Sequence, residues 1–535
     1  MTAERSTLSG PGSPVRFQWT AAAVREALGL EGVGTPEDQD RVFRRISTDT
    51  RTLEPGDLFV ALEGPTFDGH DFLAEAAERG AAGAVVRHVP AGRPQGLGLY
   101  PVTDTLGALG DLAHYRRLRL PARVVAITGS SGTTTTKELL RAALTGQVRV
   151  HATTANLNNR VGVPLTLLSA PEDAEVVVVE VGTSEPGEIE ALRRVVHPDI
   201  AVIITVGEAH VERLVDLEGV FREKLELVTG LPGGAAVVVG DEPPELADRA
   251  RDLAPGHELR VTGLSERADQ PWRGRQLEHD AVGRWRVAIP SGSFLCPVPG
   301  AHGVRCALLA LAVADLLGVP PEVAREGLPA TALPGLRTEI RHHARGVLLV
   351  DCYNANPQST EAALGWLGTL PSPGPRVAVL GSMGELGSAS EVLHRRVLDV
   401  ALDAPLHLVV AVGLFARAAE GIADPRLLRA DDPEEALALL LPRLQPGSTV
   451  LLKASRSVAL ERILPALEAA MDRTTVREAT VGEATDREAT DRGEMDRRRM
   501  ERRQAQRRET DREGADREET GPNAAGRDSD PGGMD

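Results

Sequence analysis

AITGSSGTTTTKELL, at residues 126–140, is the stretch that decides the fold of this chain. An apolar run leads into a loop of glycine and serine, and the loop passes directly into a helical pattern. We therefore predict a β-strand, a tight turn and an α-helix whose first backbone N–H groups face outward, where a phosphate can bind. By itself, such a stretch is equally compatible with a βα turn built from small residues.

The same order of strand and helix recurs after this stretch. Apolar runs at residues 174–182 and 199–207 are followed by helical patterns at residues 187–196 and 218–230. Such alternation predicts βαβ units and a mostly parallel sheet. Aromatic residues make up only 3% of the chain, so its cores must be packed from Val, Leu, Ala and Ile, which suits an α/β protein. Active sites in parallel sheets lie at the carboxyl ends of the strands.

Composition and Pro/Gly-rich stretches divide the chain into four segments. A chain of 535 residues is too long for one core. We predict a small α/β domain at residues 1–118, a central domain of the phosphate-loop type at 119–327, and a Rossmann-like α/β domain at 328–471. Residues 472–535 are almost devoid of apolar side chains, and we predict a disordered charged tail there, with one charged helix at residues 494–513 as the alternative.

Charge and cysteine usage narrow the class of protein. The net charge of −17 argues against broad nucleic-acid binding, which needs a clustered basic surface. Cys296, Cys306 and Cys352 form no CxxC pair, as expected for reduced thiols in a cytoplasmic protein. The N-terminus lacks the basic start and apolar stretch of a signal peptide. The longest apolar helical candidate, residues 307–319, is too short to cross a bilayer of ~30 Å, so we predict no membrane span.

Three residues follow or extend the strands of the central segment. Glu180 ends the run VVVVE and places a carboxylate at the tip of a buried strand, where Mg²⁺ on nucleotide phosphates needs an oxygen ligand. His210 follows the next strand, and Lys224 lies in the helix after it. Taken singly, each has an ordinary explanation: an acid that caps a turn, a structural histidine and a surface lysine. Their position beside the glycine loop is what favours a site.

Seven segments together resemble the Mur ligase family over nearly the whole chain up to residue 471. They are residues 47–72 (STDTRTLEPGDLFVALEGPTFDGHDF), 154–168 (TANLNNRVGVPLTLL), 180–192 (EVGTSEPGEIEAL), 207–214 (GEAHVERL, followed by EKLEL), 351–359 (DCYNANPQS), 379–387 (VLGSMGELG, with His394) and 451–456 (LLKASR). Within the family, YNANP and DGH resemble the members that add D-alanyl-D-alanine to a UDP-N-acetylmuramoyl-tripeptide.

The resemblance implies a fold and an activity. It implies an N-terminal domain that binds the UDP-linked precursor, a central domain that binds ATP and Mg²⁺, and a C-terminal domain that closes over both. In the implied reaction, ATP phosphorylates a carboxylate of the precursor, and the amine of the dipeptide attacks the acyl phosphate. The implied partners are the UDP-linked tripeptide and D-alanyl-D-alanine, and a monomer is the default expectation.

The resemblance also assigns roles to individual residues. Catalytic roles fall to Glu180, His210 and Lys224. The metal ligands would be Thr134, Glu180, His210 and, as a carbamate, Lys224. The implied ATP-binding residues are Gly129, Ser130, Ser131, Gly132, Thr133, Thr134, His302, Arg337, Asp351, Tyr353, Asn354 and Asn356. The implied substrate-binding residues are Ser47, Thr48, Asp49, Arg51, Asp68, Gly69, His70, Asn156, Asn158 and Asn159.

One departure from the family pattern lies in the phosphate loop itself, where Thr133 occupies the lysine position of GxxGKT. One charge pair at ~4 Å with an effective dielectric of ~20 is worth roughly 4 kcal/mol, or about a thousandfold. Lys137 lies further along the helix, and we do not expect it to substitute for the missing lysine.

Four further positions differ on what we take to be the nucleotide side. Thr205 stands where an asparagine is usual, Gly303 and Cys306 occupy the asparagine positions of HNxxN near the ATP, and Ser382 replaces the aspartate of GDM. Arg305 is a conceivable replacement cation, with a helix-surface arginine as the alternative. Losses at separate loci indicate either a weakened ATP site with compensation or a loss of the reaction.

Three functions stay open at this point. The first is an active ligase of the implied specificity. The second is a catalytically impaired protein that binds the UDP-linked precursor or a partner without ATP-driven ligation. The third keeps the ligase chemistry but changes the amine or the acid, because side-chain specificity resides in loops that the sequence does not place.

Overall fold

A six-stranded, wholly parallel sheet forms the centre of the structure, a computed structural model that describes residues 17–30, 40–92 and 94–472. Its strand order is β12-β11-β10-β7-β9-β8. The strands are β7 (Arg123–Thr128), β8 (Val150–Ala152), β9 (Val176–Glu180), β10 (Ile200–Ile203), β11 (Ala236–Gly240) and β12 (Glu258–Thr262). The predicted parallel sheet is therefore confirmed.

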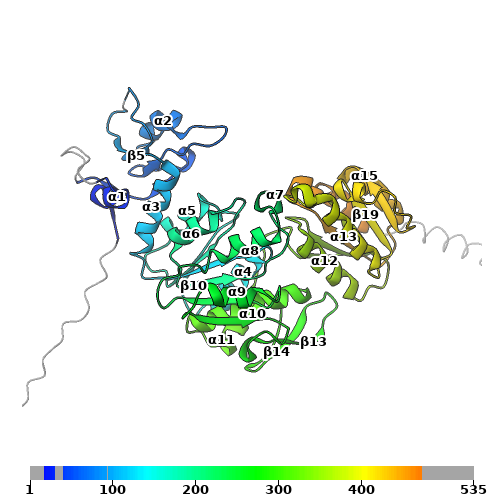
Figure 1. Ribbon diagram of the computed structural model, residues 1–535. Coiled ribbons are helices and arrows are strands. Elements are labelled where there is room, and N and C mark those ends of the chain that lie inside the picture. The colour runs from blue at the N-terminus through cyan, green and yellow to red at the C-terminus, as the bar shows by residue number, and fades with distance from the viewer. Residues whose placement is uncertain (1–16, 31–39, 93, 473–535) are drawn as a thin grey trace, which may run out of the picture. The chain divides into compact units, whose positions relative to one another are not determined.

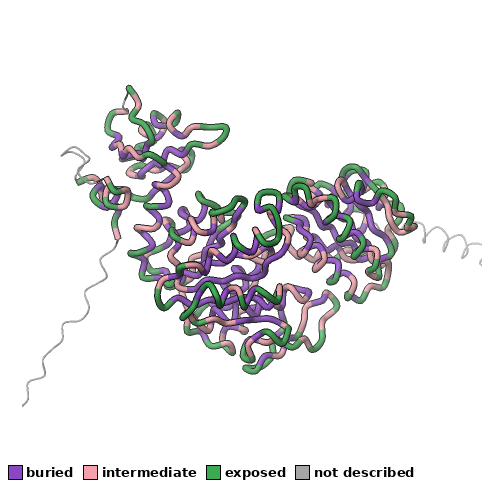
Figure 2. The backbone as a smooth tube through the Cα atoms, viewed as in Figure 1, coloured by how far each residue is buried: buried purple, intermediate pink, exposed green. Residues whose placement is uncertain are grey.

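Alternate side chains of these strands enter two different cores. Val125 and Ile127 of β7 pack with helices on one face, whereas Val124 and Ala126 pack with helices on the other. The first face is covered by α4 (Thr133–Leu144), α10 (Gly300–Leu316) and α11 (Pro321–Gly327). The second is covered by α5 (Gly162–Leu168), α6 (Glu188–Val196), α8 (Leu217–Leu225) and α9 (Leu246–Leu253). Because both faces are buried, the strands are almost continuous runs of Val, Ile and Ala, and Figure 2 shows buried backbone through this sheet.

An antiparallel insertion follows the last central strand. It consists of the short helix η4 (Gln270–Trp272) and the sheet β13 (Arg275–His279), β14 (Trp285–Ile289) and β15 (Gly292–Leu295). The turn between β13 and β14 contacts the start of α10, since the Gly300 N–H donates to the Gly283 carbonyl at 3.0 Å. This insertion was not predicted, and its first strand, RQLEH, has too few apolar residues to indicate a strand.

The N-terminal segment has its own four-stranded parallel sheet, with the order β3-β4-β5-β6. Its strands are β3 (Ile46–Ser47), β4 (Leu58–Val60), β5 (Gly83–Val86) and β6 (Gly98–Pro101), beside the antiparallel pair β1 (Trp19–Thr20) and β2 (Val42–Phe43). Its helices are α1 (Ala21–Ala27), η2 (Thr50–Thr52), η3 (Gly69–Phe72), α2 (Leu73–Glu78) and α3 (Thr105–Arg117). This is the predicted small α/β domain.

The C-terminal segment contains a second six-stranded sheet, with the order β16-β17-β21-β18-β19-β20. Only the edge strand β16 (Glu339–His343) runs antiparallel, to β17 (Gly346–Asp351). The parallel strands that follow are β18 (Arg376–Leu380), β19 (Leu408–Val412), β20 (Leu427–Ala430) and β21 (Ser448–Lys453). The helices are α12 (Pro357–Thr369), η6 (Gly387–Ala389), α13 (Ser390–Asp403), α14 (Leu414–Ala418), α15 (Pro433–Leu440), η7 (Leu441–Arg443), η8 (Arg456–Val458), η9 (Leu460–Ile463) and α16 (Leu464–Asp472). The remaining helices are α7 (Val211–Leu214) and η5 (Leu328–Ala330) of the central segment.

The three-domain α/β architecture is confirmed, while the exact boundaries stay predictions. The apolar helix predicted from residue 307 begins at Gly300, and helix α4 begins at Thr133, one turn before the KELLRAALTG pattern. The predicted tail and its alternative helix lie outside the described residues. Across the ranges that are described, no helix is both long and apolar enough to span a bilayer, and all three cysteines are free.

Candidate functional site

A cavity of about 800 Å³ lies at the carboxyl ends of the central strands, between them and the C-terminal segment. Every residue predicted for ATP or metal binding lines it. From the central segment these are Gly129, Ser130, Ser131, Gly132, Thr133, Thr134, Glu180, His210, Lys224 and His302; from the C-terminal segment they are Arg337, Asp351, Tyr353, Asn354 and Asn356. Asn156, Asn158 and Asn159, predicted for the substrate, line the same cavity.

The glycine loop presents the start of α4 to this cavity. Gly132 adopts a left-handed conformation with φ of 82°, which lets the chain turn from the strand directly into the helix. No side chain caps the helix, so its first N–H groups are available to an anion. Ser130 fixes the loop from behind: its hydroxyl donates to the Gly207 carbonyl at 3.0 Å, and its N–H donates to the Thr205 carbonyl at 2.9 Å.

Glu180 lies beside this helix start at the end of β9. The Thr134 hydroxyl donates to its Oε2 at 3.3 Å, and the Lys137 ammonium lies 3.3 Å from its buried Oε1. Burial raises the pKa of the Glu180 carboxyl, against the opposing charges of Lys137 and Arg337. A buried carboxylate beside a threonine hydroxyl supplies hard oxygen atoms of the kind that a divalent cation such as Mg²⁺ prefers.

All three lysines of the chain are buried at this site. Among 60 lysines and arginines, only Lys137, Lys224 and Lys453 are lysines, and they are 2%, 1% and 3% exposed. Lys224 and Lys453 line the cavity, and Lys137 lies directly behind it, 3.3 Å from Glu180 Oε1. Arginine has a bulky planar head group that cannot replace a compact amine in such positions. A chain that otherwise uses arginine therefore retains lysine only here.

The three amines have different surroundings. Lys137 donates to the Thr153 carbonyl at 2.6 Å and pairs with Glu138 at 3.1 Å, so its charge already has partners within the protein. Lys453 donates to Asp351 Oδ2 at 2.7 Å and to the Asn354 carbonyl at 2.9 Å. Lys224 has no ion pair among the described residues, and burial lowers its pKa to about 8.

Arg337 reaches the cavity from the C-terminal segment. Its guanidinium lies 3.7 Å from the centre of the Tyr353 ring, and its Nε is buried without a hydrogen-bond partner inside the described ranges. The residues on both sides, Leu336 and Thr338, have positive φ values of 65° and 49°, which is unusual outside glycine. The Thr338 N–H donates to Asp351 Oδ1 at 3.1 Å, and the Leu336 carbonyl accepts the Tyr353 N–H at 3.1 Å. The backbone is thus fixed in a conformation that presents this arginine.

Helix α12 joins the two segments across the cavity. The Asn356 amide donates to the Ser130 carbonyl at 2.8 Å, and the Gln358 amide donates to the Thr205 hydroxyl at 2.7 Å. Ser131 donates to Gln358 at 3.3 Å. Two positions in the phosphate loop are thereby bonded directly to residues more than 220 positions away in the chain.

Other predicted residues have partners of their own. His210 contacts the Glu385 carboxylate of the C-terminal segment. Arg305 pairs with Asp241 at 3.0 Å and with Glu242, so it is neither a free surface arginine nor an uncommitted cation. Ser382 does not line the cavity; its hydroxyl accepts the Leu414 N–H at 2.9 Å. The expectation that Ser382 belongs to the nucleotide side stays a prediction.

The residues predicted to hold the uridine diphosphate form a separate group on the N-terminal sheet. They follow the carboxyl ends of the neighbouring strands β3 and β4, and none lines the cavity described above. They are Ser47, Thr48, Asp49, Arg51, Asp68, Gly69 and His70. Arg51 pairs with Asp49 at 2.7 Å, which lowers the pKa of that carboxyl. Asp68 accepts the His70 N–H at 2.9 Å.

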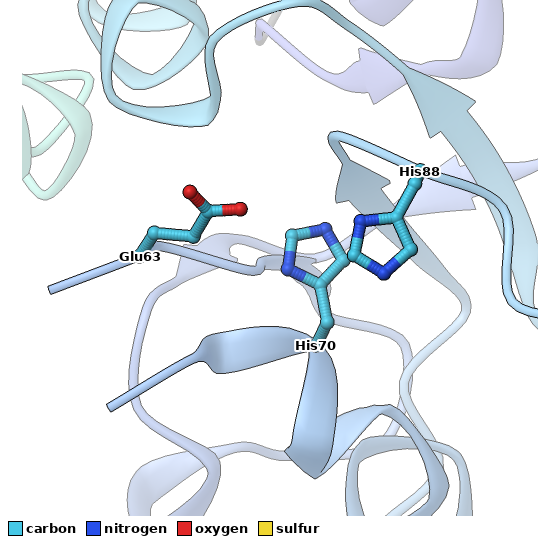
Figure 3. Close-up of side chains that lie close together, drawn as sticks. All are labelled: Glu63, His70 and His88. Carbon is cyan, nitrogen blue, oxygen red and sulfur yellow. The ribbon is translucent and has the colours of Figure 1, made fainter. Parts of the chain in front are cut away.

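Glu63, His70 and His88 also cluster on this domain, with potential ligand atoms within 4.8 Å of one another (Figure 3). The two imidazole rings are stacked, 4.2 Å apart and only 14° from parallel. Nitrogen lone pairs lie in the ring plane, so stacked rings cannot both direct them at one ion ~2 Å away. His70 also contacts Asp68 through Nδ1 and accepts the Arg87 N–H through Nε2. We infer no metal site here.

Several cavity residues were not predicted. Gln358 and Lys453 lie within the quoted motifs. Those positions could have been found from spacing. Gln276 and Trp285 also line the cavity, but they come from the unpredicted antiparallel insertion, where no motif marks them.

Comparison with known families covers all three segments. Residues 42–117 match the Mur ligase family catalytic domain, residues 127–314 the Mur ligase middle domain, and residues 336–456 the Mur ligase glutamate ligase domain. Together with a phosphate-loop cavity closed by a second α/β segment, these matches define an ATP-dependent amide-forming ligase. The chain belongs to the Mur ligase family.

Individual relatives narrow the comparison to one branch of this family. The chain is 34% identical over 442 residues to the UDP-N-acetylmuramoyl-tripeptide--D-alanyl-D-alanine ligase of Bacillus subtilis, covering 81% of this chain and 95% of the relative. Identity to the Escherichia coli ligase of the same name is also 34%, with 81% and 96% covered. A crystal structure of MurF from Acinetobacter baumannii is similar with a TM-score of 0.77 at 32% identity, covering 85% of this chain and 99% of the other. MurF from Thermotoga maritima in complex with ADP has a TM-score of 0.72 at 28% identity, with 80% and 98% covered.

Proposed function

We propose that this protein joins the amine of D-alanyl-D-alanine to a carboxylate of a UDP-N-acetylmuramoyl-tripeptide, at the expense of ATP. The names of the B. subtilis and E. coli relatives describe this activity for those proteins. The observation that carries the proposal is one cavity in which the uncapped start of α4, Glu180 and Lys224 face Arg337 and Tyr353 of the C-terminal segment. Such a product is a precursor of peptidoglycan, and we expect the reaction to take place in the cytoplasm.

A divalent cation fits the residues beside the loop. The Glu180 carboxylate lines the cavity, and the Thr134 hydroxyl lies 3.3 Å from its Oε2. Both are hard oxygen ligands of the type that Mg²⁺ prefers. Glu180 and Thr134 would hold the ion, with His210 as a further candidate; when bound, the ion would neutralise charge on the transferring phosphoryl group.

The chain's own groups would do the remaining work. The free N–H groups of α4 would accept phosphate oxygens, and Arg337 would add positive charge from the opposite wall. ATP would supply the phosphoryl group that makes the substrate carboxylate reactive toward an amine. The bonds of Asn356 to Ser130 and of Ser131 to Gln358 would hold the two walls together, and a closed cavity limits hydrolysis of the activated carboxylate.

We propose Arg337 as the cation that compensates for Thr133. Three other basic residues near the cavity are already paired with carboxylates: Lys137 with Glu180, Lys453 with Asp351, and Arg305 with Asp241. Within the described ranges, Arg337 pairs with no carboxylate, and its charge opposes the rise in the pKa of Glu180 that burial causes, so it acts on the carboxylate that we propose as a metal ligand. A cation at this point would act on the same phosphates as the usual lysine.

Lys224 is proposed to act as a carbamate. Carbon dioxide reacts only with a neutral amine, and a pKa of about 8 leaves far more neutral amine near pH 7 than an ordinary lysine has. The carbamate would convert a buried cation into a carboxylate that could hold a second Mg²⁺. At the N-terminal sheet, the residues from Ser47 to Arg51 and from Asp68 to His70 are proposed to bind the uridine diphosphate.

The first test is phosphate release by the purified full-length protein. We expect release that requires ATP, Mg²⁺, the UDP-linked tripeptide and D-alanyl-D-alanine together. Absence of release at high enzyme and ATP concentrations would contradict the ligase proposal. Calorimetry would then distinguish the alternative that Thr133 suggests: binding of the UDP-linked precursor without measurable binding of ATP would indicate a non-catalytic binding protein.

A second test compares Thr133→Lys with the parent protein. If Arg337 already supplies the charge, Thr133→Lys should change kcat/KM for ATP by less than about tenfold, whereas Arg337→Ala should lower it by about a hundredfold or more. Thr145→Lys, at the exposed far end of α4, is the matched control for an added lysine. A gain of about a thousandfold in Thr133→Lys alone would show instead that the parent site lacks its cation.

A further inference from the structure

Glu188, the first residue of α6 (Figure 1), places a carboxylate in the wall of the cavity. Its Oε2 accepts the Ser184 N–H at 2.6 Å and the Glu185 N–H at 3.1 Å. Its Oε1 has no hydrogen-bond partner, and the carboxylate has no ion pair, among the residues that the structure describes. The side chain is only partly buried, and Oε1 is not one of the buried unpartnered atoms of these residues, so this oxygen remains open to a ligand.

A second glutamate fixes the backbone on both sides of Glu188. Glu223 of α8 is 4% exposed; its Oε2 accepts the Gly187 N–H at 2.7 Å, and its Oε1 accepts the Ile189 N–H at 2.8 Å. A buried carboxylate is costly unless it is hydrogen-bonded, so these bonds leave the start of α6 little freedom. The position of Glu188 is thus set by its own bonds and by its neighbours' bonds, as expected of a group that acts on a reacting atom.

The free oxygen of Glu188 suits a cation rather than a phosphate. ATP is anionic, so a carboxylate in the same cavity repels its phosphates in the absence of a positive partner. Lys224 also lines the cavity; burial lowers its pKa to about 8, and the charges of Glu223 and Glu188 oppose this shift. If Lys224 is a carbamate, this wall carries two anions. The proposed reaction brings in one organic cation, the ammonium group of D-alanyl-D-alanine.

We propose that Glu188 binds the ammonium group of the incoming dipeptide and accepts a proton from it. This inference rests on the proposed function. Only a neutral amine can attack the acyl phosphate, and α-amino groups are mostly protonated below about pH 8. Glu223 would be the positioning residue that holds Glu188 in place.

The proton and the electron pairs are accounted for as follows. One ammonium proton passes to Glu188 Oε1, and the freed electron pair of the nitrogen forms the bond to the acyl carbon. The bond from that carbon to the phosphate oxygen breaks. A second proton leaves the nitrogen with the departing phosphate, so the products are an amide and hydrogen phosphate, and Glu188 returns its proton to water.

The test compares two nucleophiles with the full-length protein, ATP and the UDP-linked tripeptide. D-alanyl-D-alanine must lose a proton before it attacks, whereas hydroxylamine is largely neutral near pH 7 and traps the same acyl phosphate as a hydroxamate. In Glu188→Gln, one oxygen remains for the Ser184 and Glu185 N–H groups, so we expect the variant to fold. Its kcat with the dipeptide should fall by about a hundredfold or more, while hydroxamate formation should change by less than about threefold.

Glu190→Gln is the matched control, because Glu190 lies on the same helix, pairs with Arg194 and is not part of the cavity wall. It should leave both products unchanged. Glu223→Gln loses the acceptor of the Gly187 N–H, and it should lower the ratio of amide to hydroxamate by about tenfold. An unaltered ratio in Glu223→Gln would overturn its positioning role.

Equal losses of amide and hydroxamate in Glu188→Gln would overturn the inference, because the residue would then act before the amine attacks. A higher Mg²⁺ requirement in this variant would overturn it as well, since Glu188 would then be a metal ligand. Both outcomes would leave the ligase proposal intact. A parent protein that forms neither product would overturn the proposed function too.

Discussion

Lys224 places an amine in the interior with no ion pair among the residues described. Its pKa falls to about 8 because burial disfavours the charged form, although Glu223 and Glu188 oppose this. In the unfolded chain the amine would titrate near its model value of 10.5. Between these two pH values the unfolded chain binds more protons, so the stability of the fold rises with pH.

We expect this single residue to give a measurable pH dependence. In carbon dioxide-free buffer, the free energy of unfolding should rise by about 2 kcal/mol between about pH 7 and about pH 9.5 because of Lys224. Lys224→Met, which fills a similar volume without a charge, should lack this rise and be more stable near pH 7. Urea denaturation at both pH values measures the difference. Parallel pH profiles for the two proteins would contradict the depressed pKa.

The turn before α4 allows a test at the level of one element. Gly132 and Gly146 precede and follow this helix with similar φ values, 82° and 78°. A Cβ on Gly132 would lie 2.9 Å from Cys306 Sγ, whereas a Cβ on Gly146 would meet nothing within 4 Å. Both alanine variants carry the left-handed backbone cost of roughly 1 kcal/mol, and only one adds a steric clash at the phosphate loop.

We expect Gly146→Ala to lose about 1 kcal/mol of stability and to keep its affinity for ATP. Gly132→Ala should lose more stability and at least tenfold in ATP affinity. Cys306→Ala should restore part of that loss when combined with Gly132→Ala, because it removes the atom that clashes. Thermal unfolding and calorimetry with ATP measure both effects. Strict additivity of the two substitutions would argue against a direct contact between these positions.

The elements that could be predicted are those whose side chains alternate between two buried faces. The runs that became β7, β9 and β10 are recognisable because both faces of a parallel strand are apolar, and the residues after them necessarily lie at the carboxyl edge of one sheet. Strands β13 and β16 could not be found in the same way. Both lie at the edge of a sheet, and their sequences, RQLEH and EIRHH, show too few apolar residues to indicate a strand.

The residues of the candidate site also fall into those that the sequence could place and those that it could not. Glu180 could be placed because a strand end fixes its position, whereas Gln276 depends on how a whole insertion packs against α10. Similarly, the burial of Lys137 follows from its position one turn after Thr133, but its contact with Glu180 requires the register of β9 against β7. The periodicity of the sequence does not predict which distant segments contact one another.

At the scale of the whole molecule, helix α16 closes the described chain. Asp472 at its end accepts the Ala344 N–H at 3.3 Å and contacts the His343 ring at 3.0 Å, so it is bonded to β16 and the turn after it. We expect a chain ending at Asp472 to keep the melting temperature and the ligase activity of the full-length protein. A chain ending at Met471 should melt slightly lower, because it loses these two bonds. If the chain ending at Asp472 did not fold, residues 473–535 would be shown to contribute to stability.

The cavity walls come from positions as far apart as Gly129 and Lys453. During synthesis on the ribosome, the helix start at Thr133 is complete long before β21 has been translated. The complete cavity can therefore form only after β21 has been translated, and until then the central sheet is held by its own Val and Ile cores. The order of translation thereby delays ATP consumption until nearly all of the three-domain body has been made.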